Sequence, residues 1–393
     1  MQIRWSAAVL TIAALALSAC GSASVGSSKA GSATGADRGP VKLGVLGPLT
    51  GPASTYGVAE RNGVQMAVDE VNSQGGLFGK KVQVEVRDDK GGDPSVATTQ
   101  ALQLVQSDHV AAVFGPIVNT AALAVAKMSD QLKVPLLGTL GATTPVVYPD
   151  GPAGKPYPWV FRVLVSSPVQ VQTLVDYGTS KGWKRWAMIY ENDAYGQPTV
   201  TDLQAALKAS GGELVSKQAI AVDAADATAQ ALAVKAAKPD AVLVWSIQAP
   251  ASKAVSALAR VGLKTPILSS NAQVSPQFFQ LAGPLADGII ATGLKAQFGT
   301  DPDVVAFKKT YTDTFKIDPT LWAFASYDAA KLYLSKVKAL GTDDPDKLRS
   351  ALESTDFTGI TGTIKFTAQQ HDGITPDDVT LVRLQGGKGV PFS

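Results

Sequence analysis

The sequence predicts an α/β protein with two doubly wound lobes, each built around a parallel sheet. From residue 41 onward, short apolar runs alternate with amphipathic stretches, which is the pattern of βαβ units. The same pattern starts again after residue 162, so one architecture occurs twice along the chain. The chain has 393 residues, which leaves room for two or three domains with real hydrophobic cores.

The first series alternates strands and helices up to residue 137. Apolar residues recur on one face of residues 56–74, and Gly75 and Gly76 end that helix because glycine adopts the left-handed cap at little cost. A proline in the first turn supports a helix over residues 94–107. The expected strands are 41–46, 81–87, 110–114 and 134–137, and the expected helices are 56–74, 94–107 and 120–132.

The second series begins after a short apolar run at residues 159–162. Its expected helices are 168–181, 198–210, 228–237 and 252–261, and its expected strands are 185–190, 213–219, 241–245 and 266–268. Two later helices, 303–315 and 326–340, precede β-like runs at 360–366 and 379–384. Periodicity alone does not assign these last elements to a lobe.

The N-terminus has the features of a targeting segment. Arg4 precedes an uncharged apolar stretch over residues 5–17, and small residues lead to Cys20. This pattern resembles the bacterial lipoprotein signal, which implies removal of residues 1–19, a lipid on Cys20 and a membrane-anchored product. Residues 20–40 are rich in Gly, Ser and Ala and are expected to form a flexible tether. An uncleaved anchor helix and a soluble secreted protein with an incidental cysteine are the alternatives.

Composition excludes several classes of function. The net charge of +2 and the absence of a Lys/Arg cluster argue against nucleic-acid binding. One cysteine excludes an internal disulfide and a cysteine-based zinc site, and two histidines disfavour a histidine-rich metal site, so no metal or other cofactor is expected. No catalytic motif is present, and we expect His109 and His371 to be solvated loop residues, which disfavours an enzyme.

An ordered set of short motifs spans nearly the whole chain after the tether. It resembles the branched-chain amino-acid-binding (leucine/isoleucine/valine-binding-like) family of periplasmic proteins. The motifs are GPLTGP at 47–52, YG at 56–57, NSQGG at 72–76, DD at 88–89, FGP at 114–116, VPL at 134–136, GATTP at 141–145, DAYG at 193–196, KPD at 238–240, GLKT at 262–265 and YDA at 327–329.

The resemblance implies a type I periplasmic binding fold whose lobes are joined by three hinge crossings, expected near Leu164, Leu294 and Gly359. The first lobe would comprise 41–162 plus 295–357, and the second 163–294 plus 358–393. It also implies a monomeric substrate-binding lipoprotein of an ABC importer on the extracytoplasmic face, which closes on a small amino acid, carboxylate or amide and delivers it to a permease. A ligand-sensing receptor of the same fold is the alternative.

By resemblance, the first lobe holds the carboxylate of the ligand with hydroxyl groups and backbone amides. The matching positions are Asn119 and Thr120, Gly141 and Thr143, with Tyr56 nearby. Helix N-termini present unpaired N–H groups and a positive dipole end, so the physics supports an anion there. Thr120 and Thr143 could instead be structural N-caps.

On the second lobe the resemblance points to Tyr195, whose ring would close over the ligand. Trp322 and Phe324 match the aromatic wall of the pocket, although core packing is a competing role for both. A solvated loop position is the alternative for Tyr195.

Two positions depart from the family pattern. Asn271 stands where the amino-acid binders carry the carboxylate that neutralises the ligand's ammonium, and Ile247 replaces a tyrosine. A buried cation without a counter-charge is disfavoured, so the ligand could keep a carboxylate or amide and lack the ammonium, as in a small organic or aromatic acid. Glu191 or Asp193 could instead supply the missing charge, which leaves an amino acid open.

Overall fold

The computed structural model describes residues 39–392. Cys20, the expected signal segment 1–19 and nearly all of the expected tether lie outside the described residues. Within the described part of the chain, no helix is both long and apolar enough to cross a membrane.

The first sheet has five parallel strands in the order β2-β1-β3-β4-β5. Apart from the edge strand β2, which is half-buried, its strands are almost entirely buried next to the helices that connect them, as expected for parallel sheets. The elements are β1 (Lys42–Gly47), α1 (Ser54–Ser73), β2 (Gln83–Asp88), α2 (Pro94–Gln106), β3 (Ala112–Phe114), α3 (Asn119–Lys127), α4 (Ser129–Leu132), β4 (Leu136–Gly138), α5 (Thr144–Val147) and β5 (Val160–Arg162).

The second sheet has seven strands in the order β14-β13-β10-β9-β8-β6-β7. Strands β7, β6, β8, β9 and β10 are parallel, and β13 and β14 extend the sheet in antiparallel pairing. Its elements up to β10 are α6 (Ser167–Ser180), β6 (Arg185–Glu191), α7 (Gly196–Ser210), β7 (Glu213–Ile220), α8 (Thr228–Ala236), β8 (Ala241–Trp245), α9 (Gln248–Arg260), β9 (Ile267–Ser269), η1 (Asn271–Gln273), α10 (Pro276–Ala282), η2 (Gly283–Ala286) and β10 (Ile290–Leu294).

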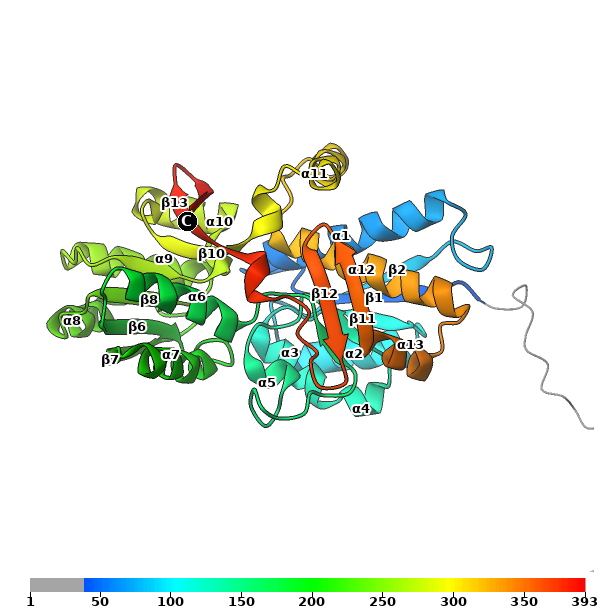
Figure 1. The fold of residues 1–393 in the computed structure, drawn as a ribbon, viewed down its shortest axis with the longest axis horizontal. Helices are drawn as coiled ribbons and strands as arrows, with labels where there is room; N and C mark the ends of the chain where they lie inside the picture. Colours follow the sequence, from blue (N-terminus) through cyan, green and yellow to red (C-terminus); the bar gives the residue numbers. More distant parts are fainter. Residues whose placement is uncertain (1–38, 393) are drawn as a thin grey trace, which may run out of the picture. The chain divides into compact units, whose positions relative to one another are not determined.

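After β10 the chain returns to the first lobe (Figure 1). The buried helix α12 packs along α1, and the Tyr333 hydroxyl donates a 2.6 Å hydrogen bond to the carbonyl of Ala111 beside β3. The elements of this last part are η3 (Lys295–Phe298), α11 (Pro302–Phe315), α12 (Leu321–Leu340), α13 (Pro345–Leu352), β11 (Ser354–Gly359), β12 (Gly362–Thr367), η4 (Pro376–Asp378), β13 (Val379–Gln385) and β14 (Lys388–Phe392).

The prediction of an α/β fold with two parallel-sheet lobes is confirmed, with local differences. The expected helix 120–132 is two helices, because the chain leaves helical geometry at Met128. Helix α9 begins at Gln248 rather than at residue 252, since a proline such as Pro250 is tolerated in the first turn of a helix. The edge strand β14 has no periodic signal in the sequence and was not expected.

The hairpin β11–β12 lies against the first lobe, although residues from 358 onward were expected in the second. Asp328 of α12 accepts hydrogen bonds from the backbone N–H groups of Ile360 and Thr361 in the hairpin turn. Phe366 of β12 packs edge-on against Phe161 of β5, with ring centroids 5.3 Å apart. The chain therefore reaches the second sheet only at β13, and the third crossing falls after β12 rather than near Gly359.

Candidate functional site

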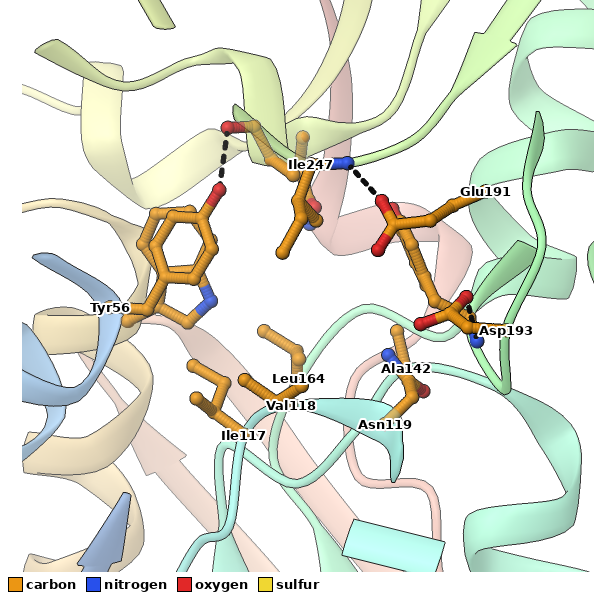
Figure 2. Close-up of a pocket in the computed structure, with 13 residues that line it drawn as sticks. Tyr56, Ile117, Val118, Asn119, Ala142, Leu164, Glu191, Asp193 and Ile247 are labelled. Carbon is orange, nitrogen blue, oxygen red and sulfur yellow. Dashed lines mark hydrogen bonds between the residues drawn. The ribbon is translucent and has the colours of Figure 1, made fainter. Parts of the chain in front are cut away.

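A pocket lies where the strand-to-helix loops of the two lobes face each other, as expected for ligand sites of open α/β sheets. It encloses about 490 Å³ of empty space, part of it open to solvent. Figure 2 shows side chains from both lobes pointing into this space. The lining residues are Tyr56, Ile117, Val118, Asn119, Ala142, Leu164, Glu191, Asp193, Tyr195, Ile247, Asn271, Ala272 and Trp322.

The two rims touch across the pocket. The Tyr56 hydroxyl, on α1, donates a 3.3 Å hydrogen bond to the carbonyl of Ala272 and accepts one from the Gln248 amide at the start of α9. The Thr143 hydroxyl donates a 3.2 Å hydrogen bond to the carbonyl of Ala194. These contacts join the loops after β6 and β9 and the start of α9 to the first lobe, so the structure is in a closed form.

Aromatic side chains form one wall of the pocket. The rings of Tyr56 and Trp322 lie 4.1 Å apart, and both side chains are buried. Tyr195 is also buried: its hydroxyl donates a 2.7 Å hydrogen bond to Ser270, and its ring lies 5.5 Å from that of Trp245. Tyr195 is therefore not a solvated loop residue. Phe324 packs on Phe307 and does not line the pocket, so for Phe324 core packing is the observed role.

Two carboxylates face the pocket: Glu191 from the last position of β6 and Asp193 from the loop that follows it (Figure 2). One Glu191 oxygen accepts hydrogen bonds from the Ser246 hydroxyl (2.6 Å) and from the Ile247 backbone N–H (3.0 Å). One Asp193 oxygen accepts from the backbone N–H groups of Tyr195 and Gly196. Burial raises the pKa of Glu191 to about 7, with a further contribution from the nearby Asp193, and burial also raises the pKa of Asp193.

Three first-lobe residues that were expected to contact the ligand support the pocket wall but do not line the pocket. They are Thr120, Gly141 and Thr143. The Thr120 hydroxyl donates to the carbonyl of Gly92 (2.9 Å), and the Thr143 backbone N–H donates to the Asn119 side-chain oxygen, which also shares the Thr143 hydroxyl proton with the carbonyl of Ala194. Gly141 lies against Asn119 with no room for a Cβ atom, which would come 2.8 Å from that oxygen. The side chains of Thr120 and Thr143 are therefore already paired, and neither caps its own helix.

Arg162 supports this wall and was not identified from the sequence. Its fully buried guanidinium donates to the carbonyls of Gly141 (2.7 Å) and Thr143 (2.9 Å) and forms two hydrogen bonds with the Asp372 carboxylate. An arginine at the end of a short apolar run carries no local signal of such a role, because its partner lies 210 residues away.

His371 also differs from expectation. It is buried, stacks on the Phe161 ring at 4.2 Å and forms a 2.8 Å hydrogen bond with the carbonyl of Val160. Burial lowers its pKa to about 4. His371 packs in the first lobe and does not line the pocket, whereas His109 is exposed as expected.

Within residues 39–392 no group of three or more His, Cys, Asp or Glu side chains is arranged to hold a metal ion. The pocket lining contains hydrogen-bonding groups, two acids and an apolar surface, and none of its members is a lysine, an arginine or a histidine. Such a lining can hold a small polar molecule, and the acids favour one that carries a positive group.

Comparisons with known proteins agree with this architecture. A Leu/Ile/Val-binding protein of Rhizobium johnstonii, BraC3, is 27% identical over 356 residues, which cover 88% of this chain and 92% of the relative. The crystal structure of a type 1 periplasmic binding protein of Bordetella pertussis superposes with a TM-score of 0.83 at 26% identity, covering 90% of this chain and 100% of the other.

A third similar structure is an ABC transporter solute-binding protein of R. palustris in complex with benzoate. Its TM-score is 0.78 at 25% identity, and the match covers 90% of this chain and 95% of the other. The family model described as periplasmic binding protein matches residues 40–388. With two closed lobes around a pocket and a match over nearly its whole described length, this chain belongs to the periplasmic binding protein family.

Proposed function

We propose that this chain is the substrate-binding lipoprotein of an ABC importer and that its solute is a small amino acid. The pair Glu191 and Asp193 carries this proposal, because both line the pocket and both have raised pKa values. Each carboxylate loses hydration by burial and neighbours another acid. A ligand ammonium placed beside them would offset both the lost hydration and the repulsion between the two acids.

Asn271 leaves two kinds of solute open, an amino acid and a small acid without an ammonium group. This proposal selects the amino acid. An anionic solute without an ammonium would meet two acids and no cationic side chain in the pocket lining. An amino acid places its positive group at the acids, so Glu191 and Asp193, at the end of β6 and just after it, replace the charge that position 271 lacks.

The carboxylate of the solute would lie at the first lobe. The helix α3 begins at Asn119, and the unpaired N–H groups of its first turn carry the positive end of the helix dipole. Asn119 lines the pocket at that end. Ile117, Val118 and Leu164 then offer an apolar surface to the rest of the solute (Figure 2).

Isothermal titration with matched pairs of ligands tests this function. Leucine and valine should bind, whereas 4-methylpentanoate and 3-methylbutanoate, which lack the amino group, should bind at least about tenfold more weakly. Glu191→Gln should weaken amino-acid binding, and Glu213→Gln, at an exposed position, should not. If benzoate or the deaminated acids bind more tightly than every amino acid, the proposal is wrong.

Closure of the lobes would couple binding to delivery. A solute that contacts both rims stabilises the closed form, which the permease would then recognise.

Cys20 would anchor the protein on the extracytoplasmic face, so Cys20→Ala should move it from the membrane fraction to the soluble fraction. Uptake of the solute should be lost on deletion of the gene; retained uptake with a lost transcriptional response would instead favour a sensing receptor.

A further inference from the structure

Asn271 carries a polar group that the protein itself does not satisfy. Its side chain lines the pocket and is 6% exposed. The carboxamide nitrogen is buried and has no hydrogen-bond partner among the described residues. A buried donor without an acceptor is destabilising, so such a group in a ligand pocket indicates a partner that arrives with the ligand.

The backbone around Asn271 is fixed by contacts behind the pocket. Its N–H donates a 3.0 Å hydrogen bond to the side-chain oxygen of Gln170, which also accepts from the Thr292 hydroxyl at 2.9 Å. The amide nitrogen of Gln170 donates to the carbonyl of Val165 in the first hinge crossing. Asn271 therefore begins η1 at a set position in the lining of the pocket.

The polar side chains next to Asn271 form their hydrogen bonds with other residues of the second lobe. The Ser269 hydroxyl donates to the carbonyl of Val244 at 2.6 Å, and the Ser270 hydroxyl accepts from Tyr195. The side-chain oxygen of Gln273 is 2.8 Å from the Ser269 hydroxyl. Unlike these three residues, Asn271 has a carboxamide nitrogen that forms no hydrogen bond in this network.

We infer that the solute is an amino acid whose side chain carries a neutral oxygen acceptor, a hydroxyl or a carboxamide, paired with the Asn271 carboxamide nitrogen. The inference rests on the proposed function and narrows its substrate class. Neutrality follows from the charges in the pocket, because Glu191 and Asp193 stand on the same lobe as Asn271 and would repel an anionic side chain. A purely aliphatic side chain would leave the buried donor unpaired.

Two nearly isosteric pairs of amino acids test this inference by titration calorimetry on the purified protein. Threonine has the shape of valine, and asparagine has the shape of leucine, so within each pair the main difference is the polar group. We expect threonine and asparagine to bind about tenfold more tightly than valine and leucine. Asn271→Leu should abolish or reverse this preference, whereas Asn192→Leu, at an exposed position outside the pocket, should preserve it.

The outcomes separate this inference from the proposed function. If valine and leucine bind as tightly as threonine and asparagine, or more tightly, the inference is overturned while the amino-acid function stands. If no amino acid binds and deaminated acids do, both fail. The wild-type comparison alone decides the matter if Asn271→Leu does not fold, and Asn271→Ala provides a smaller substitution at the same position.

Discussion

The phenol oxygen of Tyr56 lies 3.3 Å from the carbonyl oxygen of Ala272, so one hydrogen bond connects α1 of the first lobe to the η1 turn of the second. The same phenol accepts a hydrogen bond from Gln248. Both contacts exist only while the lobes are closed. The free energy of closure therefore includes a contribution from the protein itself, in addition to that from the solute.

Tyr56→Phe should shift the protein toward its open form. The substitution keeps the ring that packs on Trp322 and removes a hydroxyl whose two hydrogen bonds contribute about 1–3 kcal/mol together, so solute affinity should fall about 5- to 150-fold. Small-angle scattering should show a larger radius of gyration for the ligand-free variant than for the wild type. Tyr157→Phe, away from the pocket, is the control, and an unchanged affinity and radius for Tyr56→Phe would rule out this role.

Amino-acid binding should strengthen as the pH rises from 5.5 to about 7.5 and then level off. The free protein holds Glu191 with a pKa of about 7, so below that pH a proton must leave before the carboxylate can pair with an ammonium. Affinity should change by up to about tenfold per pH unit below 7, and calorimetry in buffers of different ionisation enthalpy should show proton release. Glu191→Gln should flatten the profile; a flat wild-type profile would exclude Glu191 as the partner of the ammonium.

Glu60 is another buried acid, placed in the first lobe away from the pocket lining. Its side chain is fully buried, one oxygen accepts from the Thr139 hydroxyl, and the other has no partner among the described residues. Burial raises its pKa to about 8. Between its unfolded value of 4.5 and about pH 8 the folded state binds more protons than the unfolded state, so stability should fall as the pH rises through that window.

Glu60→Gln should remove this pH-dependent loss of stability, because glutamine is neutral at every pH. Urea unfolding at pH 5 and pH 9 should show a decline for the wild type on the order of 3 kcal/mol and a clearly smaller one for the variant. Glu213→Gln, at an exposed position, should behave as the wild type. Equal declines in the wild type and in Glu60→Gln would show that Glu60 is ionised throughout.

The sequence identifies the parts of the pocket that follow from strand-to-helix order. Loops after parallel strands converge at one edge of each sheet, so residues placed there were expected to meet. Six of the ten residues to which the resemblance points line the pocket: Tyr56, Asn119, Tyr195, Ile247, Asn271 and Trp322. Their contact with a ligand remains a prediction.

Other features depend on partners that no local pattern reveals. Thr120 lies in the first turn of α3, but its hydroxyl donates to the carbonyl of Gly92, in a loop 28 residues earlier. His371 lies in a polar turn, and only the fold brings it under Phe161. Periodicity likewise did not place the β11–β12 hairpin, because its assignment depends on Asp328, which binds the turn from a helix more than 30 residues before it.

Loss of the Asp372 carboxylate should strongly destabilise the first lobe. The Arg162 guanidinium is fully buried, and Asp372 contacts it with two oxygens at 2.7 and 2.8 Å while the same guanidinium holds the carbonyls of Gly141 and Thr143. Asp372→Ala leaves that charge without a counter-ion, which should cost about 3–5 kcal/mol in urea unfolding and weaken solute binding through the displaced wall. Asp226→Ala, which breaks the exposed pair with Arg260, should change stability little. Equal effects of the two substitutions would mean that Arg162 finds a substitute partner or water, and that its pairing with Asp372 does not set the position of the pocket wall.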